Sequence, residues 1–135
     1  YGPRQRPDLA IRKFTTLIKS GRPIPVFGDG SSERDYTWID DIVDGVVAAV
    51  DRSVRGREEF EIINLGSGRP VRLDRLIALL SKTLGVPLLV DRQPPQPGVV
   101  VRTWADVSKA RDLLEWVPRT TLEEGLRRVA ATTRP

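Results

Sequence analysis

Short apolar segments separated by glycine and proline limit the fold of this chain more than any other feature of its sequence. Apolar residues recur at helical spacing over residues 10–18, and Gly21 follows as a stop, so we expect a helix there. Residues 24–27 and 34–38 are rich in apolar, aromatic and β-branched side chains and predict two strands that flank the turn Gly28-Asp29-Gly30. No apolar run approaches the ~20 residues of a membrane span, so we expect no membrane partner.

The rest of the chain continues this mixture of helices and strands. We expect first a helix capped by Asp40, with Val43, Val46, Val47 and Val50 on its apolar face, and then a buried strand over 60–65. A helix with Leu73, Ile77, Leu80 and Leu84 follows, closed by Gly85 and Pro87, and a strand over 88–90 comes after it. The last two elements are a short helix capped by Asp106 that ends at Leu114, and a helix with a capping box at Thr121 and with Leu122, Leu126 and Val129 on one face. Residues 93–98 hold three prolines and predict an extended loop without regular pairing.

This order of elements lacks the regular strand–helix–strand alternation of a dinucleotide-binding fold. Gly28-Asp29-Gly30 precedes a strand rather than a helix, and Gly66-Ser67-Gly68 lacks the third glycine of that fingerprint. A length of 135 residues is that of one domain. We therefore predict the α/β class, with residues 1–135 as one small mixed α/β domain.

The composition excludes several kinds of site. The chain has no cysteine and no histidine, so a disulfide framework, a common zinc site and a histidine-based triad are excluded. Its 39% hydrophobic and 30% charged residues are ordinary for a globular chain and exclude a collagen or a disordered tail. Lysine and arginine together number 22 against 18 acidic residues, and almost all of the basic residues are arginine. Arginine favours ligands that offer two acceptor oxygens, such as phosphates and carboxylates.

The beginning of the chain suggests a fragment. The chain contains no methionine and begins at Tyr1. It has no charged and apolar leader with a cleavage site, so we expect no secretory signal within it and a cytoplasmic protein. We expect a fragment or a trimmed form of a longer protein.

Residues 1–8 are the first of three segments that are more specific than the composition requires. Arg4 and Arg6 lie just before an expected helix N-terminus, and both arginine side chains and free helix N–H groups bind anions. The alternative is a solvated basic loop at a frayed terminus.

The second and third segments surround the expected strands. If residues 34–38 form a strand, Arg34, Tyr36 and Trp38 share one face, which suits a ligand with a phosphate and a planar ring. The alternative is that both aromatics are core residues and that Arg34 pairs with a carboxylate. The third segment is the proline-rich loop and the residues up to 106, which we expect to cover something. The alternative is a plain connection, with Trp104 in the core and Asp106 as a helix cap.

Together the motifs resemble the carboxyl-terminal half of nucleotide-sugar epimerases and dehydratases, which belong to the extended short-chain dehydrogenase/reductases. The motifs that carry this resemblance, in order, are Tyr-Gly-Pro-Arg-Gln-Arg-Pro-Asp at 1–8, Gly-Asp-Gly at 28–30, Arg-Asp-Tyr-Thr at 34–37, Asp-Asp-Ile at 40–42, Asn-Leu-Gly-Ser-Gly at 64–68, Gln-Pro-Gly at 96–98, Thr103, Ala-Asp at 105–106, Ser-Lys-Ala at 108–110, Trp-Val-Pro at 116–118 and Glu-Gly-Leu at 124–126. The opening octapeptide and Gln96, where UDP-galactose 4-epimerases commonly carry arginine, make the likeness to UDP-glucuronate 4-epimerases the strongest.

The resemblance implies a function for a longer parent protein. In such enzymes an amino-terminal Rossmann domain holds NAD, and a Tyr-x-x-x-Lys pair removes the proton of the sugar hydroxyl. Neither the glycine fingerprint nor that pair is present here, and Tyr1 is not the catalytic tyrosine. The resemblance thus implies an NAD-dependent isomerase as parent, commonly a homodimer. The fragment would contain no catalytic, cofactor-binding or metal-binding residue, and would be monomeric or associate through its uncovered face.

The resemblance also assigns the residues that bind a UDP-sugar. Arg34 contacts the diphosphate, the backbone at Pro25 and Phe27 reads the uracil edge, Gln96 lines the diphosphate or ribose region, and Arg6 faces the sugar and its carboxylate. Two positions depart from the family pattern. Val99 replaces the usual Asp after Pro-Gly, and Glu115 replaces the usual Gly before the Trp.

An alternative function from another class is a non-catalytic basic module that binds nucleic acid or a protein partner. The chain carries a net charge of +4 and has a pI near 10.0. Its basic residues form no cluster and acidic residues lie among them, which is not the footprint of a nucleic-acid-binding domain. We therefore expect a UDP-sugar, and no nucleic acid, as the partner.

Overall fold

The structure is a computed structural model that describes residues 1–55 and 60–133. Its elements are, in order, α1 (Ala10–Lys19), β1 (Ile24–Phe27), β2 (Glu33–Arg34), α2 (Ile39–Val54), β3 (Val71–Arg72), α3 (Leu73–Leu84), β4 (Val90–Gln93), α4 (Ser108–Leu114) and α5 (Leu122–Thr132). This mixture confirms the predicted α/β class. None of the helices described has the length and apolarity needed to cross a bilayer.

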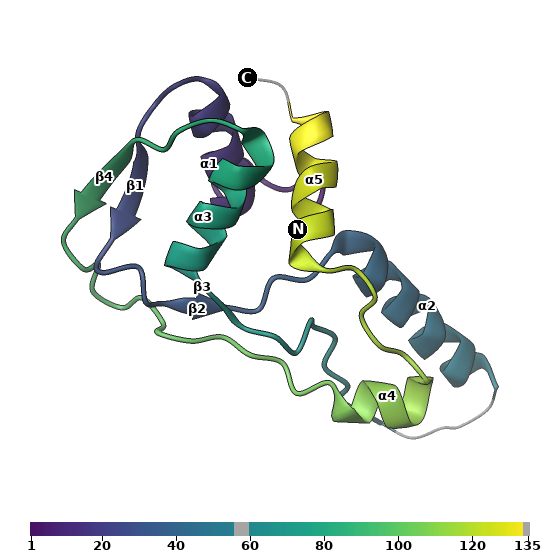
Figure 1. The fold of residues 1–135 in the computed structure, drawn as a ribbon. Coiled ribbons are helices and arrows are strands. Elements are labelled where there is room, and N and C mark those ends of the chain that lie inside the picture. Colours follow the sequence, from purple (N-terminus) through teal and green to yellow (C-terminus); the bar gives the residue numbers. More distant parts are fainter. Residues whose placement is uncertain (56–59, 134–135) are drawn as a thin grey trace.

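The described strands form two small sheets. β1 pairs with β4 in parallel, with Phe27 opposite Gln93, and β2 pairs with β3 in the antiparallel sense. The helices α1, α3 and α5 pack together beside these sheets (Figure 1). Their apolar faces form the core, in which the most deeply buried side chains are Ile11, Ile24, Leu76, Leu80, Leu126 and Val129. The periodicity predicted for these three helices is confirmed.

The caps predicted at Thr121 and Gly85 have the expected geometry. The Thr121 hydroxyl accepts the N–H of Glu124 at 3.2 Å, as in the first half of a capping box. Gly85 closes α3 in the left-handed conformation with φ of 65°. α4 begins at Ser108, one residue later than a cap at Asp106 requires, but the Asp106 carboxylate still accepts the Ser108 N–H at 2.9 Å.

The helix predicted after Asp40 exists, but its environment differs from the expectation. α2 begins at Ile39, so Trp38 holds the cap position and Asp40 lies in the first turn. The valines of its apolar face are about half exposed, whereas Asp41 and Gly45 are its buried residues. The physical reason is that α2 packs against α4 through the side that carries Gly45, where Leu65 and Trp116 lie close.

The strand predictions were only partly right. Residues 35–38 belong to no strand, and hydrogen bonds that the Asp35 side chain accepts hold this segment instead of a ladder. The buried strand predicted over 60–65 is wrong, since Phe60 is 92% and Ile62 is 70% exposed. The strand predicted over 88–90 lies at Val90–Gln93, where β1 fixes its register. Gln93, predicted to be in the loop, is therefore a paired strand residue.

Candidate functional site

Arg34 lies at the end of β2, between β3 and the segment after the proline-rich loop. Its Nη1 donates to the carbonyl oxygen of Glu33 at 2.7 Å and to that of Val101 at 3.4 Å. None of the ion pairs found within residues 1–55 and 60–133 includes Arg34. Arg34 is half-buried, and carbonyl groups hold its guanidinium group, so it retains N–H donors for an anion.

The backbone of β1 has one edge free of strand partners in the described part of the chain. The N–H groups of Ile24 and Gly28 donate to the carbonyls of Leu89 and Gln93, so these residues face β4. Backbone groups alternate in direction along a strand, and those of Pro25 and Phe27 therefore face the opposite edge. That edge offers the N–H of Phe27 and two carbonyl oxygens to a planar polar ligand.

The proline-rich loop connects these two features. It begins after Gln93, next to the end of β1, where Gly28 lies close to Pro95. It ends beside β2, where the N–H of Glu33 donates to the Val101 carbonyl at 2.8 Å. Gln96 lies exposed in this loop, between the end that adjoins β1 and the end that adjoins β2. Four of the predicted site residues thus lie on the loop and on the two strands at its ends.

Arg6 lies apart from the proline-rich loop and its flanking strands. It forms an ion pair with Asp8 at 3.3 Å, and 72% of its side chain is exposed. It lines a separate cavity of about 550 Å³ together with the other residues of the opening turn, Leu9 and Ile39. The lining of this cavity includes none of the four residues around the loop.

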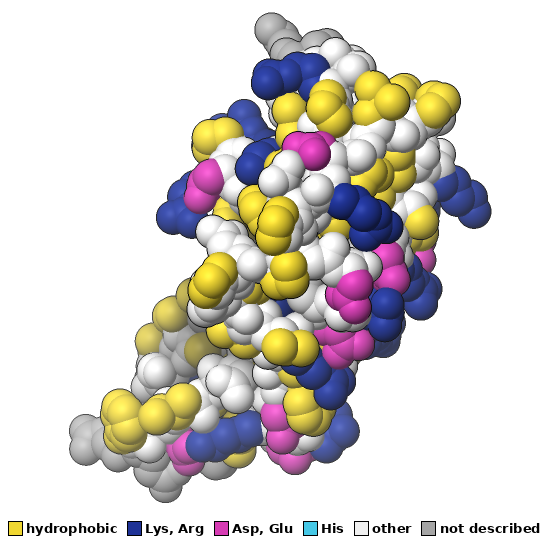
Figure 2. All heavy atoms as spheres, turned by 90° about the vertical axis from the view of Figure 1, so that its left-hand side faces the viewer, with side chains coloured by type: hydrophobic (Ala, Val, Ile, Leu, Met, Phe, Trp, Pro, Cys, Tyr) yellow, Lys and Arg dark blue, Asp and Glu magenta, His cyan; other side chains and the backbone are white. Residues whose placement is uncertain are grey.

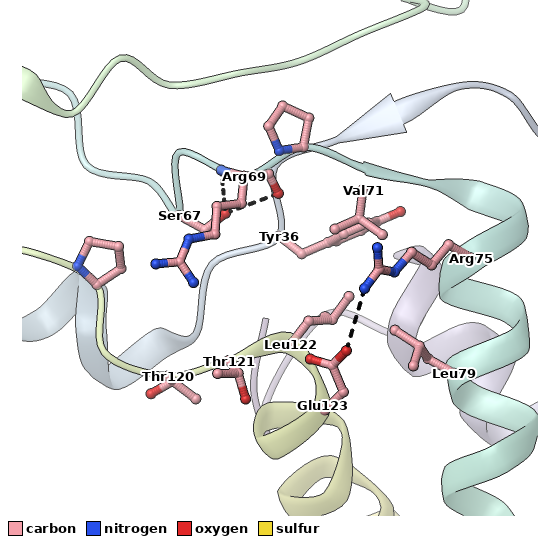
Figure 3. Close-up of a pocket in the computed structure, with 12 residues that line it drawn as sticks. Tyr36, Ser67, Arg69, Val71, Arg75, Leu79, Thr120, Thr121, Leu122 and Glu123 are labelled. Atoms are coloured by element: carbon pink, nitrogen blue, oxygen red, sulfur yellow. Dashed lines mark hydrogen bonds and ion pairs between the residues drawn. The ribbon is translucent and has the colours of Figure 1, made fainter.

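The predicted common face of Arg34, Tyr36 and Trp38 does not form, because residues 35–38 are not a strand. Trp38 is 4% exposed and belongs to the core, as the alternative for the second segment proposed. Tyr36 lines a cavity of about 260 Å³ beside α3 and the start of α5, and burial raises the pKa of its phenol (Figure 3). In this cavity Arg75 is directed at Glu123, 3.8 Å away, so that cation already has an anionic partner.

Trp104, in the third segment, does not fill the core. Its side chain is 59% exposed, and its Nε1 donates to the Gly68 carbonyl at 3.3 Å. The guanidinium of Arg102 lies over its ring, 5.7 Å from the centroid. The alternative that placed Trp104 in the core is therefore wrong.

Asp35 connects three distant segments, a role that the sequence analysis missed. Its carboxylate accepts the N–H groups of Ser67 at 2.8 Å, Gly68 at 3.0 Å and Ala105 at 3.1 Å. The glycine turn is tight, since a Cβ added at Gly66 would lie 2.4 Å from that of Ala105. The occurrence of Asp35 directly after Arg34 in a specific motif was the only signal in the sequence.

Asp41 has a similar role on α2. It is 5% exposed and accepts the N–H and the hydroxyl group of Thr120 at 2.9 and 3.1 Å. Its main-chain carbonyl accepts the indole N–H of Trp116 at 2.9 Å. Both acidic residues thus stabilise the scaffold.

Charges of both signs are mixed on the face that carries β1 and β4. Figure 2 shows this face, on which basic and acidic side chains lie among hydrophobic ones without a continuous basic surface. This distribution agrees with the interspersed charges of the sequence and is not the pattern of a nucleic-acid interface.

Comparisons with known proteins identify relatives that match nearly the whole chain. Residues 1–129 match the family described as GDP-mannose 4,6 dehydratase. The UDP-glucuronate 4-epimerase of Thermodesulfobacterium geofontis is 40% identical over 129 residues, which are 95% of this chain and 38% of that protein. An uncharacterised protein of Methanocaldococcus jannaschii is 42% identical over 128 residues, with the same shares of the two chains.

Solved structures share the fold. The crystal structure of the UDP-glucuronic acid 4-epimerase from Bacillus cereus in complex with UDP-glucuronic acid and NAD has a TM-score of 0.90 at 36% identity, covering 98% of this chain and 41% of that one. The UDP-glucose 4-epimerase of Thermotoga maritima, solved with UDP-glucose, has a TM-score of 0.85 at 33% identity, covering 98% and 42%. The chain spans about two fifths of the length of these relatives. Its sequence and fold confirm the resemblance to nucleotide-sugar epimerases and dehydratases, and the chain belongs to the GDP-mannose 4,6 dehydratase family.

Proposed function

We propose that residues 1–135 are the carboxyl-terminal, substrate-binding part of an NAD-dependent UDP-sugar 4-epimerase, and that its substrate is UDP-glucuronate. The likeness over nearly the whole chain to UDP-glucuronate 4-epimerases carries the proposal. In this proposal the chain binds the nucleotide end of the substrate, and the groups that perform the chemistry lie outside it.

The arrangement around the proline-rich loop supports a UDP ligand. The diphosphate carries about two negative charges and needs a donor that bonds two oxygens at once, which the guanidinium of Arg34 provides. One edge of uracil presents an N–H between two carbonyl oxygens. The free edge of β1 can pair with part of that edge, since the N–H of Phe27 can donate to one uracil oxygen while a carbonyl of Pro25 or Phe27 accepts the uracil N–H. Gln96 in the loop is placed to line the region between them.

Arg6 is assigned to the sugar in this proposal. Its place before α1 supports a role with an anion, because a cation at a helix N-terminus is disfavoured by the helix dipole unless an anion lies near. Its partner in the structure is the carboxylate of Asp8, on the exposed surface. A sugar carboxylate would replace one anionic partner of Arg6 by another.

Neither glycine turn among the described residues fits NAD. The Gly28-Asp29-Gly30 turn leads into a two-residue strand, and Gly30 packs against Asp74 of α3. The N–H groups of the second glycine turn, at Ser67 and Gly68, already donate to the Asp35 carboxylate. A pyrophosphate needs such N–H groups free at the start of a helix. Within the proposal, NAD therefore binds to residues outside this chain.

Calorimetric titration of the chain with UDP-glucuronate tests the proposal. The Arg34→Ala variant should bind about 10- to 150-fold more weakly, which corresponds to a lost hydrogen bond to a charged group of about 1.5–3 kcal/mol. Arg127→Ala, which removes an exposed arginine of α5, is the matched control and should leave the affinity unchanged. Equal affinities of the Arg34 variant and the unmodified chain would contradict the role of Arg34.

A comparison of the kinetics with two sugars tests the choice of substrate. In the complete enzyme, UDP-glucuronate should be preferred over UDP-glucose in kcat/KM, because an arginine aimed at a carboxylate is left unpaired by the neutral sugar. Arg6→Ala should reduce that preference. Equal kcat/KM for both sugars would contradict the choice of UDP-glucuronate while leaving UDP binding in place.

A further inference from the structure

The cavity that Tyr36 lines, of about 260 Å³, lies beside the first turns of α3 and α5 (Figure 3). Its lining comes from four segments that are far apart in the sequence, namely Tyr36, residues 67 and 69–71, Arg75 and Leu79 of α3, and residues 118 and 120–123. The four predicted site residues around the proline-rich loop are not among them. A ligand in this cavity would therefore use other groups than those assigned to UDP.

The hydrogen bonds of two carboxylates fix the walls of this cavity. Asp35 accepts the N–H groups of Ser67 and Gly68 at 2.8 and 3.0 Å, which holds the turn that precedes Arg69. Asp41 accepts the N–H group of Thr120 at 2.9 Å, which holds the segment that leads into α5. The walls are therefore in place without a ligand, and binding would require little ordering of the chain.

Arg69 supplies a positive charge to the cavity. Figure 3 shows its guanidinium group directed into the cavity from the turn that carries it. Within residues 1–55 and 60–133, none of the ion pairs includes Arg69, and the hydrogen bonds of this residue involve its main-chain groups. The other charged residues of the lining, Arg75 and Glu123, face each other at 3.8 Å. Two arginines against one glutamate leave one positive charge in excess, which favours an anionic ligand.

Two hydroxyl groups of the lining can bind a polar ligand. Tyr36 is half-buried, and none of the hydrogen bonds found among the described residues involves its hydroxyl group. No fully buried side-chain polar atom of the described residues lacks a partner, so this hydroxyl group is open to the cavity. The hydroxyl oxygen of Thr121 accepts the N–H of Glu124, and its own proton remains available to an acceptor.

The volume and the apolar part of the lining restrict the size and shape of the ligand. Sites for drug-sized molecules measure about 300–1,000 Å³, so a cavity of about 260 Å³ suits a compact molecule with one ring rather than a nucleotide sugar. Val71, Leu79 and Leu122 line the cavity with apolar side chains. Such side chains match the C–H groups of a sugar ring, while the ring hydroxyls match the polar groups of the lining.

We infer that this cavity is a second ligand site, which binds a single sugar ring that carries one phosphate or carboxylate group. Arg69 binds the anionic group, and the hydroxyl groups of Tyr36 and Thr121 bind hydroxyl groups of the ring. None of the residues proposed to bind UDP takes part, so the two sites can be tested separately.

Titration of the chain with glucose 1-phosphate and, separately, with glucuronate tests this site when amide resonances are followed by NMR. At least one of the two ligands should shift the amides over residues 67–71 and 120–123 in a saturable way. Arg69→Ala should weaken its binding about 10-fold or more, because a hydrogen bond to a charged group is lost, and Tyr36→Phe should weaken it about 2- to 10-fold. Arg22→Ala, which removes an exposed arginine outside the cavity, is the matched control and should leave the affinity unchanged.

Three results would overturn the assignment of this site. The first is the absence of saturable shifts at these amides with both ligands, including the case in which the shifts are confined to the surroundings of Arg34 and Gln96. The second is an Arg69 variant that binds as tightly as the unmodified chain while its spectrum keeps the native dispersion. The third is equal affinity for glucose 1-phosphate and for inorganic phosphate or neutral glucose, because the ring or the charge would then contribute nothing. UDP-glucuronate is titrated separately, so a failure of the proposed function and a failure of this site are distinguishable.

Discussion

Asp35 should contribute more to stability than any other exposed or half-buried carboxylate of the chain, and the substitution Asp35→Ala tests this. The substitution removes the acceptor of three main-chain N–H groups, at Ser67, Gly68 and Ala105, with distances of 2.8, 3.0 and 3.1 Å. At about 1 kcal/mol for each lost hydrogen bond, the free energy of unfolding should fall by about 3 kcal/mol. The free energy of unfolding of a domain is only about 5–15 kcal/mol, so this change is large.

Urea denaturation followed by circular dichroism measures this change. Asp29→Ala is the matched control, because the hydrogen bonds that Asp29 accepts from described residues come from Ser31 within its own turn, and its loss should change stability little. Asp35→Asn keeps one acceptor oxygen, so its free energy of unfolding should lie between those of Asp35→Ala and Asp29→Ala. If Asp35→Ala costs no more than Asp29→Ala, the three long-range hydrogen bonds do not hold these segments together and our reasoning is wrong.

Three further predictions concern the site and the core. Gly45→Ala places a Cβ 2.7 Å from a methyl group of Leu65 and 3.1 Å from the Trp116 ring, so it should destabilise the chain by about 1–3 kcal/mol in urea denaturation. Burial raises the pKa of Tyr36, so its contribution to stability should be full below pH 10 and should fall as the pH rises further. In measurements of the thermal midpoint against pH, a Tyr36→Phe variant should lose less stability over the same range. Arg34→Lys should recover only part of the UDP-glucuronate affinity lost in Arg34→Ala, as calorimetry can show, because a lysine lacks the planar pair of donors. A lysine variant with full affinity would contradict the bidentate contact.

The helices of the core were predictable because their local signals agree. In α3 the apolar spacing, a buried face around Leu80 and the left-handed Gly85 all indicate the same element. α5 adds its capping threonine. The strands were not predictable in the same way, since β2 and β3 have two residues each and no periodicity can be read from two residues. Pairing with a distant segment defines them.

The candidate site, like the fold, was predictable only in part. Arg34, Pro25, Phe27 and Gln96 were named from the resemblance to a family, and their grouping around one loop depends on the β1–β4 pairing, which the sequence does not state. The role of Asp35 depends on partners 32 to 70 residues away in the chain. Hydrogen bonds over such separations leave no local pattern, so only the folded arrangement reveals them.

The neighbours of Arg34 explain why its guanidinium group has no carboxylate partner among the described residues. Glu33, on one side, pairs with Arg102 at 2.9 Å. Asp35, on the other side, directs its oxygens at main-chain N–H groups. Each adjacent carboxylate thus has a partner that does not compete for Arg34, and carbonyl groups, which carry no net charge, hold the guanidinium in place. The positive charge of an arginine held by neutral acceptors is not offset by a carboxylate, so it is available to an anionic ligand such as a diphosphate.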